Sequence, residues 1–349
     1  MVFYRKYRPQ TLVELDKEDI RTRLTAILQS GRIPHAFLFA GPKGTGKTST
    51  ARIVAKVLNC ERTSIEPCDK CENCTAIKAG SHIDVYEIDA ASSRGIDEIR
   101  ELRERVALSP AMAKYKVYII DEVHMLTREA FNALLKTLEE PPGHVVFILA
   151  TTEIHKLPDT ILSRCVLLPF TKATNDEITR SLQRVINGEQ LRISEESVKL
   201  IAHHADGSFR DATKLLEQAV AEGKLDTESI RSLLGVAHLG VDEFVALIHR
   251  KKTPEALSLL QERANSGVDF TVFTQALIEF LHTQLLLSYQ TNSEKKSVGL
   301  TKGELKQLLK VFTRAHLELR GSVLPQLPLE LVVIEWCEGN QYTNKQISK

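Results

Sequence analysis

Glycines, a lysine and a threonine are concentrated in one short stretch, Gly41-Pro42-Lys43-Gly44-Thr45-Gly46-Lys47-Thr48, which fits the P-loop pattern G-x-x-x-x-G-K-[ST]. Glycines let backbone N–H groups line a concave anion site, because no Cβ blocks the approach. A helix predicted to begin near Lys47 would add its N-terminal partial charge. Lys47 would place a cation on the β- and γ-phosphates, and the Thr48 hydroxyl would ligate Mg²⁺. The stretch therefore predicts a triphosphate site.

Two carboxylates end an apolar run further along the chain. The run Val117-Tyr118-Ile119-Ile120 leads into Asp121 and Glu122, as in a buried parallel strand whose carboxyl end faces a ligand. In a P-loop protein this is the Walker B position, where Asp121 would hold the Mg²⁺ shell and Glu122 would orient and polarise the attacking water. The pattern alone is weak, and it becomes specific because a P-loop precedes it by about 70 residues.

Hydroxyl groups end another apolar run. The predicted strand 145–150 leads into Thr151 and Thr152, either of which could hydrogen-bond the attacking water or the γ-phosphate. The alternative is that both threonines are present because β-branched residues favour strands.

Four cysteines lie within 15 residues: Cys60, Cys68, Cys71 and Cys74. Two C-x-x-C steps share Cys71, and thiolates at this spacing can surround one ion tetrahedrally. The iron–sulfur pattern needs a fourth cysteine about three residues downstream followed by proline, whereas here the fourth lies upstream. The spacing therefore favours structural Zn²⁺, and an iron–sulfur cluster or metal-free thiols are the other interpretations. A closed site of four protein ligands would stabilise the polar segment 63–67 rather than catalyse.

The elements that must position these residues alternate between strands and helices. Strands are predicted over 36–40, 85–90, 116–122, 145–150 and 166–170, and helices over 20–28, 47–58, 96–108, 128–138 and 160–164. This alternation predicts an α/β fold with a doubly wound parallel sheet, which binds ligands at its carboxyl edge.

The strand pattern stops at residue 171. Amphipathic segments over 176–186, 194–203 and 210–221 predict three helices, and the chain from 241 to about 338 is all-helical. Within it, the apolar run 277–287 is expected to lie inside a helix bundle, and 339–349 to be a frayed tail. We therefore expect domains at 1–170, with a cysteine insert at 60–74, and at 171–237 and 238–349.

The composition is that of an ordinary soluble protein, with 43% hydrophobic and 26% charged residues. The net charge of +1 excludes a strongly basic chain, so DNA contact would need a local patch or an assembled surface. Residues 1–11 have no apolar core of signal-peptide length, and we expect no run of about 20 apolar residues that would span a membrane. These features favour a cytoplasmic protein.

Several motifs together resemble one family, the gamma/tau subunits of bacterial DNA polymerase III. They are Tyr7-Arg8-Pro9-Gln10-Thr11, the P-loop, the four cysteines, Asp121-Glu122-Val123-His124-Met125-Leu126, the segment from Phe131 to Pro142, Ala150-Thr151-Thr152, Ser163-Arg164-Cys165 and Gly207-Ser208-Phe209-Arg210-Asp211. The resemblance is dense over 1–220 and thin afterwards. It implies an AAA+ core with a three-helix lid and a helical collar for oligomerisation, which form the ATPase motor of the sliding-clamp loader.

The resemblance also implies roles for single residues. Arg164 resembles the arginine finger that reaches the neighbouring subunit's ATP, and Arg210 resembles the lid arginine that senses nucleotide in its own subunit. Thr151 or Thr152 would be the first sensor, Tyr7-Arg8-Pro9 would form part of the adenine pocket, and the four cysteines would be the zinc ligands. Without the family, each arginine would more often be a surface ion-pair residue.

Two features depart from the family pattern. After Thr11 the family usually shows a phenylalanine and then Val-Gly-Gln, where this chain has Leu12 and Asp16-Lys17-Glu18; this difference bears on base contacts in that region. The chain also stops after the collar, before the segments with which the longer tau form binds helicase and polymerase. We expect a gamma-length product or a trimmed longer chain.

The mechanism implied by the resemblance uses ATP, Mg²⁺ and Zn²⁺ in an ATP hydrolase that belongs to a DNA polymerase holoenzyme. An arginine supplied in trans contributes on the order of 10³–10⁵ in rate, so a lone subunit should bind ATP yet hydrolyse it poorly. ATP binding would tighten a ring-like pentamer that opens the clamp, and primed DNA would trigger hydrolysis. The implied partners are delta, delta-prime and further gamma/tau subunits, the sliding clamp, primed DNA and, through accessory subunits, single-strand-binding protein.

Two other classes of protein stay open. One is a structural loader subunit similar to delta-prime that binds no nucleotide, which Lys47, Thr48, Asp121 and Glu122 argue against. The other is a different AAA+ motor, such as a branch-migration helicase or a helicase loader, which the cysteine cluster and Ser163-Arg164-Cys165 argue against.

Overall fold

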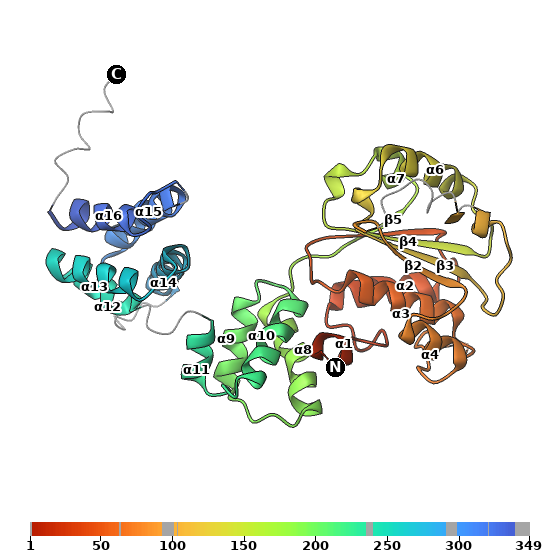
Figure 1. Ribbon diagram of the computed structural model, residues 1–349, viewed down its shortest axis with the longest axis horizontal. Helices are drawn as coiled ribbons and strands as arrows, with labels where there is room; N and C mark the ends of the chain where they lie inside the picture. The colour runs from red at the N-terminus through yellow and green to blue at the C-terminus, as the bar shows by residue number, and fades with distance from the viewer. Residues whose placement is uncertain are drawn as a thin grey trace, which may run out of the picture. The chain divides into compact units, whose positions relative to one another are not determined.

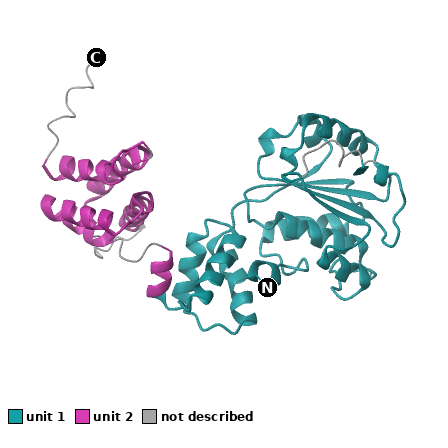
Figure 2. Ribbon diagram, viewed as in Figure 1, with its two compact units in different colours: residues 1–227 teal, residues 228–349 magenta. Residues whose placement is uncertain are grey.

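The computed structural model describes residues 2–62, 64–92, 101–102, 104–234, 240–290, 299–319 and 321–338. The chain divides into two compact units, residues 1–227 and 228–349 (Figure 2). Unit 1 contains a parallel sheet with helices, and the secondary structure described in unit 2 is entirely helical (Figure 1).

Five parallel strands form the sheet of unit 1, in the order β2-β3-β4-β1-β5. The strands are β1 (Ala36–Ala40), β2 (Val85–Asp89), β3 (Lys116–Asp121), β4 (Val145–Thr151) and β5 (Val166–Pro169). Every residue of β1 and β4 is buried, which explains why these central strands are almost continuously apolar. Because all five strands run in the same direction, the loops that follow β1, β3 and β4 leave the sheet at one edge.

Helices cover both faces of the sheet (Figure 1). Helices α2 (Glu18–Gln29) and α3 (Lys47–Asn59) pack on one face, in a core that includes Phe37 and Phe39 of β1. Helices α6 (Arg128–Glu139) and α7 (Asp159–Leu162) pack on the other face, in a core that includes Leu38. Successive residues of β1 therefore alternate between two cores, and the predicted doubly wound sheet is confirmed.

Three further helices of unit 1 follow the sheet: α8 (Asn175–Gly188), α9 (Glu195–His204) and α10 (Phe209–Ala221). Each begins after a hydroxyl residue that caps its first turn, namely Thr174, Ser194 and Ser208. In α8 the Glu177 side chain also accepts from the Thr174 N–H, which completes a capping box. The shorter elements of unit 1 are α1 (Phe3–Lys6), α4 (Glu72–Ala79), η1 (Val123–Met125) and η2 (Ile154–Lys156).

Unit 2 begins within α11 (Thr227–Leu233) and continues as a helix bundle. Its helices are α12 (Val241–His249), α13 (Thr253–Asn265), α14 (Phe270–Gln290), α15 (Lys302–Leu319) and α16 (Leu327–Glu338). Phe244, Phe273 and Phe312 meet in its core, and all three are fully buried. Aromatic residues from three helices thus hold the bundle together.

Helix α14 corrects one expectation from the sequence. Among the described residues, it alone is long and apolar enough to cross a membrane by length and composition. Its buried residues Phe270, Phe273, Leu277 and Leu281 belong to the core of unit 2, and core helices of soluble proteins pass the same test. A single helix of this kind is weak support for a membrane span. The prediction that the run 277–287 lies inside a bundle holds for Leu277 and Leu281, which are buried, but not for Leu286 and Leu287, which are about half exposed.

The strand predictions agree with the structure to within one residue at each end. Of the helix predicted over 96–108, residues 96–100 and 103 lie outside the described residues, and 101–102 and 104–106 are helical. The tail predicted over 339–349 also lies outside them. Helix α4 was not predicted, because its first turn is capped by a cysteine: the Cys71 Sγ accepts from the Cys74 N–H.

Asp84 organises the loop that leads into β3. Its side chain is 1% exposed, and its carboxylate accepts from the backbone N–H groups of Ala111, Met112 and Ala113 at 2.8–3.1 Å. Burial by itself would raise the Asp84 pKa, but these N–H groups outweigh it and hold the pKa below its ordinary value. The position of β3, and so of Asp121, depends partly on this carboxylate.

We expect Asp84→Asn to destabilise unit 1 by about 2 kcal/mol, because an amide cannot accept all three backbone hydrogen bonds. Since the folded-state pKa of Asp84 is lowered, its stabilisation is present above its unfolded pKa of about 4 and is lost as the pH falls through the folded value. Denaturant unfolding at several pH values measures both effects. Asp19→Asn, at an exposed carboxylate, is the control; an equal loss in the two variants would contradict the assignment.

Candidate active site

The P-loop connects β1 to α3, as predicted. Gly44 has a φ of +79°, and a Cβ built there would lie 2.0 Å from the Ser208 Oγ. The Gly44 carbonyl also accepts from the Phe209 N–H at 3.0 Å. The start of α10 therefore lies directly against the loop, and only glycine permits this approach.

Lys47 is the first residue of α3 and is 6% exposed. Its Nζ donates to the carbonyls of Gly41 at 2.7 Å and Pro42 at 2.9 Å. Burial lowers the pKa of this ammonium, and the carboxylates of Glu122 and Asp121 oppose that shift. The loop thus holds a cation at the N-terminus of a helix, where an anion would be bound.

Thr48 and Asp121 meet although they are 73 positions apart in the sequence. The Thr48 Oγ1 donates to the Asp121 Oδ2 at 2.5 Å, and the Asp121 Oδ1 accepts from the Glu122 N–H at 3.0 Å. A hydroxyl and a carboxylate at this distance are oxygen ligands of the kind that Mg²⁺ prefers. The donor set therefore fits the ion predicted from the two motifs.

Glu122 has a φ of +47°, which is unusual for a residue with a side chain. Its Oε2 accepts from the Thr152 Oγ1 at 2.9 Å and from the Thr152 N–H at 3.2 Å. Thr151 is fully buried and instead contacts His124, whose Nδ1 lies 3.0 Å from the Thr151 Oγ1. The two threonines thus differ: Thr152 contacts the acid, and Thr151 contacts a histidine that the sequence analysis did not single out.

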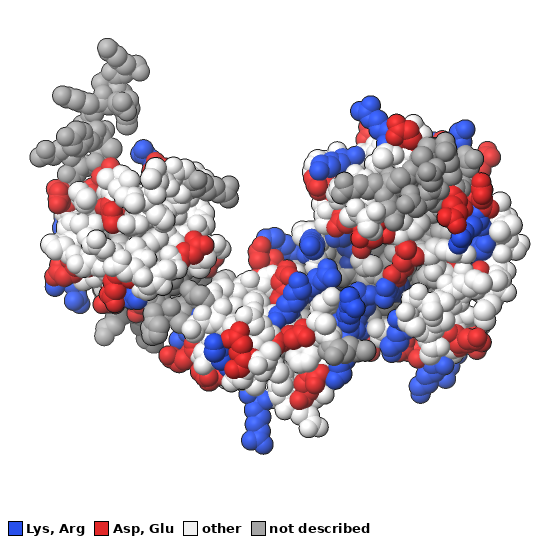
Figure 3. Space-filling model, in the orientation of Figure 1, with Lys and Arg blue, Asp and Glu red and all other residues white. Residues whose placement is uncertain are grey.

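A cavity of about 620 Å³ in unit 1 gathers most of the predicted nucleotide residues. The predicted residues that line it are Tyr7, Arg8, Pro9, Lys43, Gly44, Thr45, Gly46, Lys47, Thr48, Asp121, Glu122 and Arg210. Figure 3 shows Lys and Arg side chains gathered on unit 1 where α8–α10 approach the sheet. The volume suits a ligand of nucleotide size, and the lining offers cations for its phosphates and carboxylates for a metal ion.

Arg210 and Arg164 occupy different surroundings. The Arg210 guanidinium lies 4.8 Å from the ring centre of Tyr4, at the cavity. Arg164 does not line the cavity. Its Nη2 lies 2.7 Å from the Glu139 Oε1, and its Nη1 donates to the Thr160 carbonyl at 2.7 Å. Arg164 therefore cannot be assigned to the cavity of its own chain, and Glu139 orients it.

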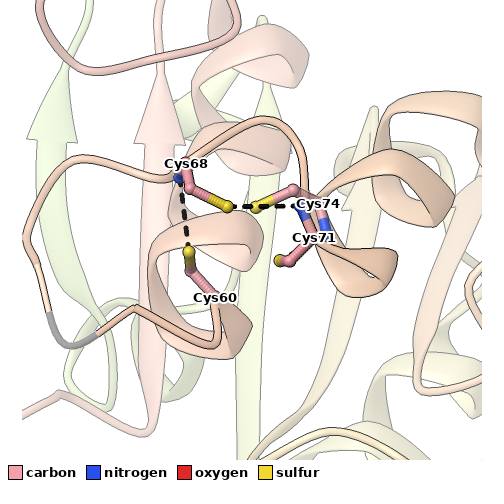
Figure 4. Close-up of side chains that lie close together, drawn as sticks. All are labelled: Cys60, Cys68, Cys71 and Cys74. Atoms are coloured by element: carbon pink, nitrogen blue, oxygen red, sulfur yellow. Dashed lines mark hydrogen bonds between the residues drawn. The ribbon is translucent and has the colours of Figure 1, made fainter.

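The four predicted cysteines converge on one point (Figure 4). Their sulfur atoms all lie within 4.8 Å of one another, and a single tetrahedral Zn²⁺ would place them about 3.8 Å apart. Backbone N–H groups of Lys70 and Cys71 lower the pKa of Cys68 to about 6, whereas burial raises the pKa of Cys74. A cation among the sulfurs would favour the thiolate of Cys74, and the four sulfur atoms fit a closed metal site.

Three family models match successive segments that together cover most of the chain. Residues 16–174 match the family described as "DNA polymerase III, delta subunit". Residues 177–225 match "DNA polymerase III clamp loader subunit, ATPase lid domain", and residues 225–347 match "DNA polymerase III subunits gamma and tau domain III".

Curated relatives carry corresponding names. The chain is 40% identical to DNA polymerase III subunit tau of Bacillus subtilis, over 96% of this chain and 63% of the relative. It is 35% identical to DNA polymerase III subunit gamma of Buchnera aphidicola from Acyrthosiphon pisum, over 93% of this chain and 91% of the relative. The chain spans only about half to two-thirds of the tau relatives from Bacillus, Salmonella and Escherichia.

Solved structures support the fold alone. The Thermotoga maritima protein titled "RuvB Holliday junction branch migration motor" has a TM-score of 0.51, with 19% identity over 69% of this chain and 79% of that one. This likeness concerns the arrangement of helices and strands and says nothing of activity.

Proposed function

Because the chain belongs to the family of DNA polymerase III gamma and tau subunits, we propose that it is an ATPase motor subunit of a bacterial replicative clamp loader. ATP binding and hydrolysis would serve to open the sliding clamp and load it on primed DNA. The observation that carries the proposal is the 2.5 Å contact between Thr48 and Asp121 beside a cavity of nucleotide size. It supports a catalytic nucleotide site rather than a structural copy of the fold.

Each residue of the site has a proposed task. The P-loop N–H groups and Lys47 would bind the β- and γ-phosphates, and Thr48 with Asp121 would hold Mg²⁺. When bound, Mg²⁺ neutralises charge on the phosphates. Glu122 would accept a hydrogen bond from the attacking water, and Thr152 would keep that carboxylate in place until the γ-phosphate is present.

The remaining contacts of the nucleotide come from elsewhere in unit 1. Tyr7-Arg8-Pro9 would contact the base. Arg210, a residue of α10, would contact the bound nucleotide and so couple the position of α10 to nucleotide binding. Thr151 would act through His124 rather than on the water directly, because its hydroxyl lies at that ring. Gly41 and Pro42 do not line the cavity, and their carbonyls would hold Lys47 before it engages phosphate.

Arg164 would complete the site of the neighbouring subunit. Its place outside the cavity of its own chain and its ion pair with Glu139 support this role. Hydrolysis would then require assembly, since a cation in trans contributes on the order of 10³–10⁵ in rate. The cysteines would hold one Zn²⁺ in a structural site.

We further propose the domain boundaries 1–170, 171–237 and 238–349. The family matches at 16–174, 177–225 and 225–347 support three domains and the first boundary, whereas the last match and the second compact unit begin about ten residues before 238. The partners would be delta, delta-prime and further gamma/tau subunits, the sliding clamp, primed DNA and, through accessory subunits, single-strand-binding protein. The protein would act in the cytoplasm.

We expect Lys47→Ala to weaken ATP binding on the order of 100-fold, because two charge-assisted contacts to phosphate are lost. Lys43→Ala is the matched control, since Lys43 lies in the same loop but is exposed, and it should weaken binding by less than about tenfold. Calorimetric titration with ATP and Mg²⁺ measures both. An unchanged affinity in Lys47→Ala would contradict the P-loop assignment.

We expect Arg164→Ala to keep its ATP affinity within about twofold but to lower DNA-stimulated hydrolysis on the order of 10³-fold in the reconstituted loader. The measurement is ATP turnover and clamp loading with clamp, delta, delta-prime and primed DNA. Arg128→Ala, at an exposed arginine of α6, should behave as the wild type. Normal stimulated turnover in Arg164→Ala would refute the role in trans.

We expect the purified chain to contain about one Zn²⁺, by elemental analysis, because four thiolates form one closed site. Cys71→Ser should lose the metal and unfold at a lower denaturant concentration. Cys337→Ser should retain it, because Cys337 lies in unit 2 and is not one of the four clustered cysteines. Iron in place of zinc, or no metal at all, would overturn the assignment.

A further inference from the structure

Lys56 is a charged residue inside the core of unit 1. It lies on α3, the helix that begins at Lys47, and is only 1% exposed. An ammonium buried this deeply costs several kcal/mol unless it is paired and hydrogen-bonded. Its ion pair and hydrogen bonds must offset that cost. They join the loop between the cysteines to the segment that lines the cavity.

The first contact of Lys56 is with the cysteine cluster. Its Nζ lies 2.5 Å from the Asp69 Oδ1, and Asp69 stands between Cys68 and Cys71 with a φ of +52°. The second carboxylate oxygen of Asp69 lies 2.8 Å from the Lys78 Nζ. Because cysteines flank Asp69, a metal held by them would fix the backbone that aims this carboxylate at Lys56.

The second contact of Lys56 is with the cavity wall. Its Nζ donates to the Gln10 Oε1 at 2.5 Å, and the Gln10 Nε2 donates to the Arg8 carbonyl at 2.9 Å. Arg8 and Pro9 line the cavity. A chain of hydrogen bonds thus runs from the cysteine cluster through one buried ammonium to the wall where the base would lie.

A parallel contact joins the same two parts. The Glu66 Oε2 accepts from the Leu12 N–H at 3.0 Å. Glu66 belongs to the segment between Cys60 and Cys68, and Leu12 is fully buried. The segment 8–12 is therefore held at two points: Gln10 binds Lys56, which binds Asp69, and Leu12 binds Glu66.

We propose that the cysteine cluster braces the base-binding wall of the nucleotide cavity, and that Lys56 is the positioning residue that transmits this support. The inference rests on the proposed function, in which the cavity holds ATP with its base against residues 7–9. It assigns the metal site a role in nucleotide affinity, through the base rather than the phosphates. The P-loop makes its phosphate contacts independently of this wall.

The test compares ATP with inorganic tripolyphosphate, which has the phosphates but no base. We expect Lys56→Met to weaken ATP binding about tenfold, as for the loss of one charge-assisted hydrogen bond, and to change tripolyphosphate binding by less than about twofold. Lys78→Met is the matched control, because Lys78 contacts the same Asp69 from the protein surface and does not reach the wall. It should bind both ligands as the wild type does.

Two further variants keep the test valid if Lys56→Met fails to fold. Gln10→Ala and Glu66→Ala remove other contacts between residues 8–12 and the cysteine-bearing part of unit 1, and both residues are half-buried. Each substitution should weaken the binding of ATP more than the binding of tripolyphosphate. Thermal unfolding of every variant is measured alongside. An equal loss of affinity for both ligands would mark a general loss of structure and would overturn the inference.

Removal of the metal supplies an independent readout. Removal of Zn²⁺ by a chelator selective for it over Mg²⁺, with Mg²⁺ kept in excess, should weaken ATP binding in the wild type. It should add little to the loss in Lys56→Met, because both act through one path. If the wild type bound ATP and neither chelation nor these substitutions changed its affinity, the inference would fail while the proposed function stood. If the wild type bound neither ligand, the proposed function itself would fail.

Discussion

The hydrogen bond between Thr48 and Asp121 is the interaction on which the site depends. It joins the loop that follows β1 to the end of β3. The strands β1 and β3 are not neighbours in the sheet, because β4 lies between them. The contact requires three parallel strands in register, so that their loops emerge at one edge of the sheet. The two hydrophobic cores that clamp the sheet fix this register, since a slip of one residue would exchange Phe37 and Leu38 between them. The packing of the two cores therefore determines where Thr48 and Asp121, the proposed metal ligands, lie relative to one another.

The strands of the sheet and most residues of the site could be predicted from the sequence, because the local sequence patterns favour the same structure as the tertiary packing. The strands β1, β3 and β4 are apolar runs with polar ends, and Lys47, Thr48, Asp121 and the four cysteines stand in patterns whose spacing has a chemical cause. What remained hidden was the pairing of side chains between distant segments. Nothing in the sequence indicates that Thr152, rather than Thr151, contacts Glu122, or that Glu139 holds Arg164. Such choices depend on rotamers and on loop geometry, including the positive φ of Glu122, which follow from the assembled sheet.

The predictions that fell short have a common physical origin. Helix α4 begins at Glu72, directly after Cys71, so its N-cap is a sulfur rather than a usual hydroxyl or carboxylate. The known N-cap preferences do not include cysteine. Helix α14 combines an apolar inner side with further apolar residues on its outer side, including Leu286 and Leu287. Composition alone therefore cannot separate a bundle helix from a membrane span. In both cases the deciding information lies in what surrounds the helix.

Helix α3 shows how the two chemical sites of unit 1 share one scaffold. Lys47 and Lys56 are nine residues apart, about two and a half turns, so they project from opposite sides of the helix. Each is a buried ammonium that contributes unfavourable desolvation, and apolar residues at both positions would serve the fold better. Each charge is directed at a neighbouring loop: the Lys47 Nζ at the phosphate loop and the Lys56 Nζ at the loop between the cysteines. Helix α3 thus carries a paired lysine near each of its ends. The cysteine cluster and the nucleotide cavity therefore both depend on the position of this one helix.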